Sequence, residues 1–254
     1  MINFISLTNN GYITFADNQI ENFKKDYLKK HKLYLYCSDE DSYQYHLKKQ
    51  LPDNIILIKL NTEISGLHSY LQGRFKELMR LKIPLIVDCI NRLKAPVWFI
   101  DNDILMLQDP EPYIDSTKDI IFQADCHEQA KYCWVCTGCF WINDTDNALK
   151  LLKNIIDLQS KIDRGEQQIL NDYCKSWPKN YQDGYVTPDM WGDILQVKEA
   201  NLDIFPYYLF QSGHIAFKMN QYDKHNCVMI HFNHEMSYET KLSNLQKAID
   251  HYGI

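Results

Sequence analysis

Short apolar runs alternate with longer amphipathic segments along much of the chain. A short apolar run that is bounded by polar or turn-forming residues predicts a buried strand. Runs of this kind occupy residues 4–7, 33–37, 55–60, 97–100, 120–123 and 139–142. Strands that alternate with helices favour an α/β fold with a mostly parallel sheet. Such sheets bind their ligands beyond the carboxyl ends of the strands.

Three longer segments have the spacing of helices. Residues 17–30 predict one helix, and residues 146–161 predict a second, amphipathic one. Residues 74–93 predict either one helix or two that are broken at Pro84. The residues that share one face of the first segment are Ile20, Phe23, Tyr27 and Leu28. Because no repeat, low-complexity tract or Gly/Ser linker divides the sequence, we expect a single domain over residues 1–254.

The amino-acid composition limits the binding partners and the location that we expect for the protein. The chain has 33 Asp and Glu against 27 Lys and Arg, a net charge of −6, and no basic cluster, so nucleic acid is not an expected partner. Hydrophobic residues make up 45% of the chain, which excludes intrinsic disorder. The apolar runs are far shorter than the roughly 20 residues that cross a membrane. Residues 1–6 lack a basic leader, so we expect a cytoplasmic protein without a signal peptide or membrane anchor.

The eight cysteines predict reduced thiols, because no secretion signal accompanies them. Cys133 and Cys136 have the spacing of zinc ligands, and Cys139 follows closely. A structural zinc site needs a second pair of ligands, and no such pair is evident in the sequence. Buried or idle cysteines are therefore favoured over a zinc site.

Asp101 and Asp103 are the most informative polar residues because they follow directly after the apolar run at residues 97–100. Side chains at i and i+2 of an extended chain point to the same side. Two carboxylates on one side of a strand end can bind a hard divalent cation such as Mg²⁺ or Mn²⁺. The alternatives are a solvated acidic loop and a haloacid-dehalogenase-like phosphatase, in which the first Asp is a nucleophile.

Residues 97–110, Val-Trp-Phe-Ile-Asp-Asn-Asp-Ile-Leu-Met-Leu-Gln-Asp-Pro, resemble the central motif of GT-A glycosyltransferases, above all of families 8 and 77. The resemblance implies a GT-A (Rossmann-like) fold with a mixed, mostly parallel central sheet flanked by helices. It also implies metal-dependent transfer of a sugar from a nucleotide-diphosphate sugar, with UDP as the expected nucleotide. Retention of the anomeric configuration and a Mn²⁺ (or Mg²⁺) cofactor are further implications.

The same resemblance assigns roles to individual residues. The metal would be held by Asp101, Asp103 and His231, with His231 in the closing His-x-Asn motif that precedes Lys241. Gln167 would lie near the reacting sugar carbon, and Asp125 and Arg80 would orient the donor sugar. The remaining residues expected to bind the donor, through its nucleotide or its diphosphate, are Thr8, Asn9, Gly11, Asp39, Lys82, Asp101 and Lys241.

Two departures from the family pattern keep an alternative open. Cys136 stands where asparagine is usual, and Glu166 stands where aspartate is usual. A non-catalytic nucleotide-sugar-binding domain on the same fold is therefore a further interpretation. His214, His225 and His234 compete with His231 as the third ligand. The acceptor, whether a glycan, a protein or a small molecule, is left open.

Overall fold

The computed structural model describes residues 1–68, 74–125, 134–161, 163–173, 200–218, 226–233 and 237–253. Its centre is a seven-stranded sheet with the order β3-β2-β1-β4-β7-β6-β8. Within it, β7 runs antiparallel to both of its neighbours, and the other paired strands are parallel. The sequence-based prediction of a mixed, mostly parallel sheet is confirmed. The strands are β1 (Asn3–Thr8), β2 (Lys32–Cys37), β3 (Ile55–Lys59), β4 (Val97–Ile100), β6 (Ile120–Asp125), β7 (Trp134–Ile142) and β8 (Leu202–Ile204).

A second, three-stranded sheet has the order β5-β10-β9. Its strands are β5 (Ile104–Met106), β9 (Phe210–Ser212) and β10 (Met229–His231). Strand β10 pairs antiparallel with β5 and parallel with β9. Because β5 begins directly after Asp103, residues 101–103 form the passage from the large sheet to the small one.

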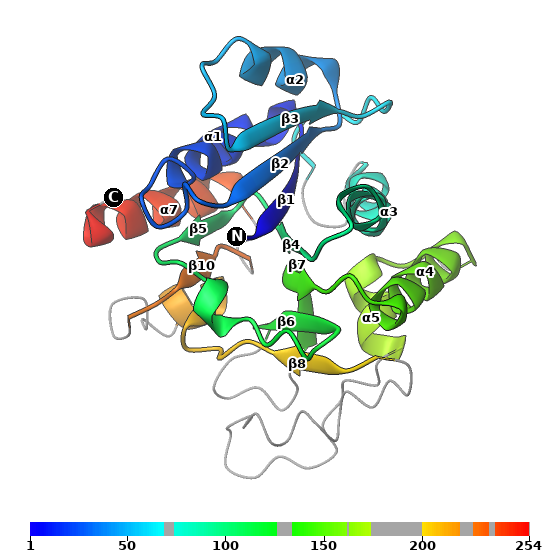
Figure 1. Ribbon diagram of the computed structural model, residues 1–254. Helices are drawn as coiled ribbons and strands as arrows, with labels where there is room; N and C mark the ends of the chain where they lie inside the picture. The colour runs from blue at the N-terminus through cyan, green and yellow to red at the C-terminus, as the bar shows by residue number, and fades with distance from the viewer. Residues whose placement is uncertain are drawn as a thin grey trace.

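Helices cover both faces of the large sheet (Figure 1). One face packs against α3 (Phe75–Leu93), α4 (Asp146–Lys161) and α5 (Glu166–Tyr173), whereas α1 (Ile13–Asn22) and the small sheet cover the other. Helix α7 (Tyr238–Tyr252) packs on the small sheet, and α2 (Glu40–Leu47) lies beside β3. The short helical turns are η1 (Asn10–Tyr12), η2 (Glu111–Tyr113) and η3 (His214–Lys218). No helix among the described residues is long and apolar enough to span a membrane.

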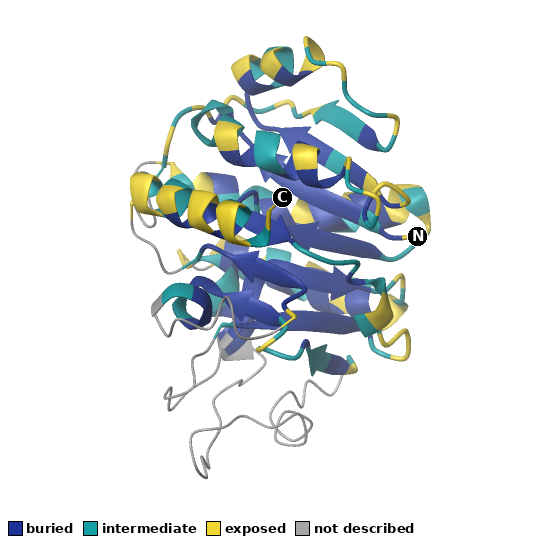
Figure 2. Ribbon diagram, turned by 90° about the vertical axis from the view of Figure 1, so that its left-hand side faces the viewer, coloured by how far each residue is buried: buried dark blue, intermediate teal, exposed yellow. Residues whose placement is uncertain are grey.

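The core follows the alternation of side chains along the strands. In β4, Val97 and Phe99 join the apolar cluster under α3 and α4, whereas Trp98 and Ile100 join the cluster on the opposite face. All four are buried, as Figure 2 shows for the strands as a group. This burial on both faces explains why residues 97–100 form a continuous apolar run.

The first helix differs from its prediction. It runs from Ile13 to Asn22 rather than over residues 17–30. The Asn54 side chain donates to the Phe23 carbonyl at 3.0 Å and to the His31 carbonyl at 3.1 Å, which holds the following segment in tight turns. By contrast, α3 is one helix through Pro84, because apolar residues on both sides of the proline are buried against the sheet.

The pairing of β6 with β7 contains a bulge that shapes the site. Phe122 pairs with Phe140, but the next residue, Gln123, pairs with Cys136. Residues 137–139 of β7 therefore have no partner on β6. On its other edge the bulged segment stays close to β4, since the Asp101 amide donates to the Gly138 carbonyl at 2.7 Å. The bulge thus brings Gly138 to the carboxyl end of β4.

Candidate active site

Asp101, Asp103 and His231 lie together where the two sheets meet. The Nε2 atom of His231 is 3.3 Å from Oδ1 of Asp103 and 3.8 Å from Oδ2 of Asp101. One possible ligand atom from each residue lies within 4.8 Å of the others. The antiparallel ladder of β5 and β10 explains this arrangement, because it pairs His231 with Ile104, the residue after Asp103. These three residues form what we call the carboxylate–His231 cluster.

A lysine holds the outer oxygen of each carboxylate. Lys82 Nζ is 3.1 Å from Asp101 Oδ1, and Lys241 is ion-paired with Asp103 Oδ2. Asp101 Oδ2 and Asp103 Oδ1 therefore face His231. Burial opposes ionisation of Asp103, but Lys241 and His231 outweigh it and hold the pKa of this carboxyl well below its usual value. Each of the two carboxylates thus has one oxygen paired with a lysine and the other oxygen facing His231.

Lys82 is almost fully buried, at 2% exposure. Besides Asp101, it contacts Glu166 Oε1 at 3.2 Å and donates to the Thr137 carbonyl at 3.2 Å. Burial favours the neutral amine, but Asp101 and Glu166 outweigh it and raise the pKa of Lys82. Lys82 therefore stays charged, and Glu166, the departure from the family pattern, helps to keep it so.

Two further residues that the sequence analysis did not assign also shape the cluster. A Cβ atom on Gly138 would lie 2.3 Å from His231 Cε1 and 2.5 Å from Asp101 Oδ2, so only glycine leaves room for both side chains. Asn102 accepts from Ser6 Oγ at 2.7 Å and donates to the Leu7 carbonyl at 2.8 Å. These bonds anchor the turn at residues 101–103 to β1. The signal for Gly138 is a single glycine inside a strand, which marks close approach of another group.

Asp125 and Gln167 lie together. Gln167 Nε2 donates to Asp125 Oδ2 at 2.9 Å, and Asn233 donates to Asp125 Oδ1 at 3.0 Å. The Thr137 amide donates to Gln167 Oε1 at 3.1 Å. Because Thr137 belongs to the bulge and Asn233 follows His231 by two residues, Asp125 and Gln167 are tied to the carboxylate–His231 cluster.

The cysteines near the cluster are buried thiols. Cys136 Sγ lies 3.6 Å from His231 Nδ1, and burial raises the pKa of this thiol well above its usual value. Cys139 contacts Met229 and Trp98. Cys133 lies outside the described residues. Among the residues described, no candidate group of metal ligands contains a cysteine.

Four of the residues expected to bind the donor are tied to backbone groups: Thr8 at the end of β1, Asn9 and Gly11 in the loop that follows it, and Asp39 at the start of α2. Asn9 accepts from the Gly11 amide at 3.1 Å and donates to the Gly66 carbonyl at 2.8 Å. Asp39 caps α2 by accepting from the Ser42 amide at 2.7 Å, and it accepts from the Asn10 amide at 2.9 Å. Thr8 is buried and donates to the Asn9 carbonyl. These contacts shape the loop, and donor binding by it stays a prediction.

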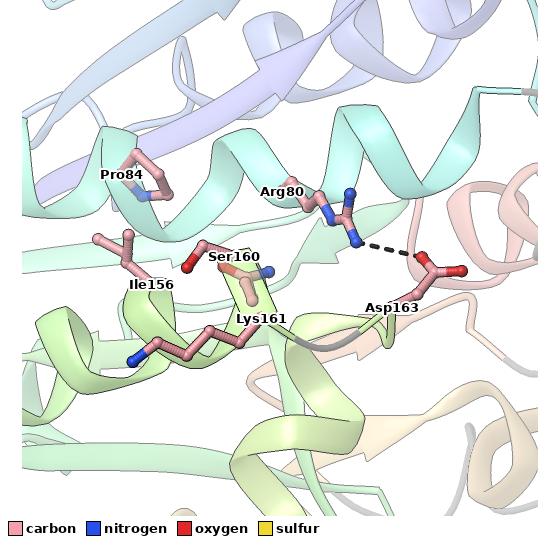
Figure 3. A pocket seen from close by; sticks show the side chains of 7 residues that line it. Arg80, Pro84, Ile156, Ser160, Lys161 and Asp163 are labelled. Carbon is pink, nitrogen blue, oxygen red and sulfur yellow. Dashed lines mark hydrogen bonds and ion pairs between the residues drawn. The ribbon is translucent and has the colours of Figure 1, made fainter.

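Arg80 points away from Lys82 on α3. Its guanidinium bonds to Asp163 at 3.1 Å in a pocket that α3 and α4 line on the surface (Figure 3). Residues two apart on a helix face nearly opposite sides, which explains why Lys82 reaches Asp101 and Arg80 does not share that direction. Its expected contact with a donor sugar also stays a prediction. Of the competing histidines, His214 begins η3, whereas His225 and His234 lie outside the described residues.

Comparison with protein families gives a match to the nucleotide-diphospho-sugar transferases over residues 29–245. The chain belongs to this family. This transferase matches many solved structures, and three matches at low identity establish a shared fold. They are a glycosyltransferase involved in glycosylation of the major capsid of PBCV-1, the galactosyltransferase LgtC in complex with donor and acceptor sugar analogs, and the glycosyltransferase GlyE of Streptococcus pneumoniae TIGR4. No curated protein matches the transferase significantly.

The three alignments cover nearly all of the transferase. The glycosyltransferase involved in PBCV-1 capsid glycosylation is 12% identical with a TM-score of 0.51, and the alignment covers 100% of the transferase and 99% of that chain. LgtC is 13% identical with a TM-score of 0.56, at 99% and 95% coverage. GlyE is 15% identical with a TM-score of 0.54, and the transferase spans only 62% of its length. The GT-A fold is thereby confirmed, and a glycosyltransferase replaces the phosphatase as the interpretation of Asp101 and Asp103.

Proposed function

We propose that this transferase moves a sugar from a UDP-linked donor to an acceptor with retention of configuration, using Mn²⁺ or Mg²⁺ bound by Asp101, Asp103 and His231. The observation that carries the proposal is the convergence of one atom from each of these residues within 4.8 Å. Membership in the family supports the class of donor, and the resemblance to families 8 and 77 supports UDP and retention.

The donor set suits such a cation. Carboxylate oxygens are preferred by Mg²⁺ and Mn²⁺, and an imidazole nitrogen is compatible with Mn²⁺. Because lysines hold the outer oxygens, Asp101 and Asp103 each have one oxygen for the cation. A cation that prefers six ligands would have positions left for the diphosphate. When bound, it would supply positive charge to the diphosphate as the glycosidic bond breaks.

The residues around the cluster would act on the donor directly. Lys241, which stands beside Asp103, would contact the diphosphate as a point charge. Asp125, held at both oxygens by Gln167 and Asn233, would accept hydrogen bonds from the sugar hydroxyls. Gln167 would lie near the anomeric carbon. Arg80, Asp39, Thr8, Asn9 and Gly11 complete the proposed donor site, with Lys82 fixing Asp101.

Thermal unfolding with and without ligands tests this proposal. We expect Mn²⁺ and UDP together to stabilise the protein far more than either does alone. Ligand at about a hundred times its dissociation constant adds roughly 2.7 kcal/mol. At roughly 2–4 °C per kcal/mol for a chain of this size, the midpoint should rise by about 5–11 °C. The Asp101→Asn variant should lose the synergy and keep its unliganded midpoint.

Two outcomes would contradict the proposal in different ways. Absence of synergy with UDP would remove the assigned donor. Synergy without any slow release of UDP from UDP-glucose, UDP-galactose or related donors would instead favour the non-catalytic binding domain. Asp109→Asn serves as the matched control, because Asp109 is a carboxylate with a neighbouring histidine and lysine at another place in the fold.

A further inference from the structure

Gln123 connects three strands behind the carboxylate–His231 cluster. It lies on β6 at the bulge, with an exposure of 0%. Its Nε2 atom donates to the Phe210 carbonyl of β9 at 3.2 Å, and its Oε1 atom is 2.8 Å from Nδ1 of His231 on β10. The bulge directs the side chain toward the small sheet. Its two partners there, the Phe210 carbonyl and the His231 ring, are both distant from Gln123 in sequence.

These contacts determine which ring nitrogen of His231 carries the proton. A carbonyl oxygen can only accept, so the amide nitrogen of Gln123 must face Phe210. The amide oxygen therefore faces His231, and because it too can only accept, Nδ1 of the ring must donate. A ring that binds a cation is neutral and has a single proton, so in that form the lone pair lies on Nε2. Nε2 is the nitrogen that faces Asp101 and Asp103, at 3.8 and 3.3 Å.

We propose that Gln123 is a positioning residue that fixes the tautomer and the ring orientation of His231, so that the lone pair of Nε2 points at the bound cation. This inference rests on the proposed function, since it assumes a cation at the carboxylate–His231 cluster. Histidine ligands commonly donate their other ring N–H to a carboxylate or carbonyl oxygen, and loss of such a partner weakens metal binding by about 10–100-fold. Here a side-chain amide provides that oxygen, and the Phe210 carbonyl orients the amide.

A purely structural role for Gln123 predicts different behaviour. If the residue only filled space, Gln123→Met would preserve the site, because the two side chains are similar in length and shape. If the amide oxygen sets the tautomer, Gln123→Met should change which ring nitrogen carries the proton. Gln123→Glu should preserve the Nδ1 proton, because one carboxyl oxygen still accepts from Nδ1 and the other, when protonated, donates to the Phe210 carbonyl. Gln211→Met is the matched control, since Gln211 is an equally buried amide on β9 that donates to the Tyr208 carbonyl at 3.0 Å.

The first measurement uses the protein without metal. Nitrogen-15 correlation spectra of histidine-labelled protein distinguish a protonated ring nitrogen from a bare one, and loss of signals in His231→Gln identifies the residue. We expect the proton on Nδ1 in the wild type, in Gln123→Glu and in Gln211→Met, and a changed tautomer in Gln123→Met. A bare Nδ1 in the wild-type protein, or an unchanged spectrum in Gln123→Met, would overturn the inference without reference to any activity.

The second measurement follows Mn²⁺ binding directly, through the electron paramagnetic resonance signal of the free ion. We expect affinity to fall by about 10–100-fold in Gln123→Met and to be largely kept in Gln123→Glu. An equal loss in Gln211→Met would show that any buried amide matters and would overturn the assignment to Gln123. Wild-type protein that binds no Mn²⁺ would overturn the proposed metal site itself, while the spectra would still decide whether Gln123 sets the tautomer. Thermal midpoints of all variants show which of them are folded.

Discussion

The described part of the chain holds two groups of one histidine with two carboxylates, and the two groups differ in which ring nitrogen of the histidine carries a proton. In the first group, His31 lies beside Asp109 and Glu111; in the second, His231 lies beside Asp101 and Asp103. Both groups have the residue types and the spacing of a metal site.

A backbone amide distinguishes the His31 group from the His231 group. The Ile2 amide donates to His31 Nδ1 at 3.0 Å, so Nδ1 accepts and the ring proton lies on Nε2. That proton is directed at Asp109 Oδ1, 3.0 Å away, and Lys30 pairs with both Asp109 and Glu111. The His31 group is thus a closed hydrogen-bonded network, whereas the contact of His231 Nδ1 with Gln123 leaves Nε2 to bind a cation. Proximity of ligand types does not identify a metal site until the protons are placed.

The largest expected difference between the two groups is in catalysis. Asp103→Asn should lower transfer by about a hundredfold or more, because it removes charge from the site where the diphosphate departs. Asp109→Asn should leave the rate near that of the wild type. Steady-state rates at saturating donor and metal, with circular dichroism to confirm folding, make the comparison. Wild-type turnover in folded Asp103→Asn protein would remove the metal assignment.

Replacement of each histidine should separate metal binding from stability. His231→Ala should raise the Mn²⁺ concentration for half-maximal activity by at least about tenfold, since loss of a ligand should cost no less than loss of its partner. His31→Ala should leave this concentration unchanged and lower the free energy of unfolding by about 2–4 kcal/mol, because it leaves a cavity and a buried amide unpaired. Metal titrations and denaturant unfolding measure the two quantities. If His31→Ala raised the Mn²⁺ requirement and His231→Ala did not, the metal site would have to be assigned to the His31 group instead.

A smaller effect on stability and Mn²⁺ binding is expected when a methyl group is added at Gly138 beside the carboxylate–His231 cluster. Gly138→Ala should cost about 1–3 kcal/mol and weaken Mn²⁺ binding, because the new methyl group overlaps His231 and Asp101. Gly165→Ala is the control, since no atom lies within 4 Å of a Cβ at that position. Calorimetric titration with Mn²⁺ compares the two. Unaltered binding in Gly138→Ala would mean that the ligands can shift without loss.

The smallest expected effect is in the pH dependence of stability. Burial lowers the pKa of His31 below its ordinary value of 6.5, and burial does the same for His46. The folded state therefore keeps these rings neutral while the unfolded state takes up protons, so stability is full above about pH 6.5 and falls below it. Each ring contributes at most about 1.4 kcal/mol per pH unit. Urea unfolding between pH 7 and 5 should show a shallower fall in His31→Gln than in the wild type.

Local signals account for what could be predicted. Asp101 and Asp103 follow an apolar strand directly, and residues 97–100 and 146–161 appear in the structure with the predicted bounds. Helices α2 and α7 are capped by Asp39 and Ser237, whose side chains accept from backbone amides of the first turn. Both residue types are common N-caps, so these two helix starts also had a local signal in the sequence.

Pairings between distant segments account for what was missed. Strands β5, β9 and β10 have three residues each and exist because they pair with one another. The position of His231 beside Asp103 depends on that ladder, and sequence reasoning reached it only through a family resemblance. Gln123 had no local signal, because the groups that give it a role come from two other strands.

Because of the bulge in β7, assembly of the site depends on the number of residues at positions 137–139 as much as on which residues they are. Side chains alternate along a strand, so a slip of one residue exchanges the two faces of the sheet. Removal of one residue from positions 137–139 would either pull the Gly138 carbonyl away from Asp101 or slip Val135 and Cys136 against β6. Substitutions at residues 137–139 should therefore have graded effects. A single-residue deletion there should instead leave a sheet that still folds but a site that no longer assembles.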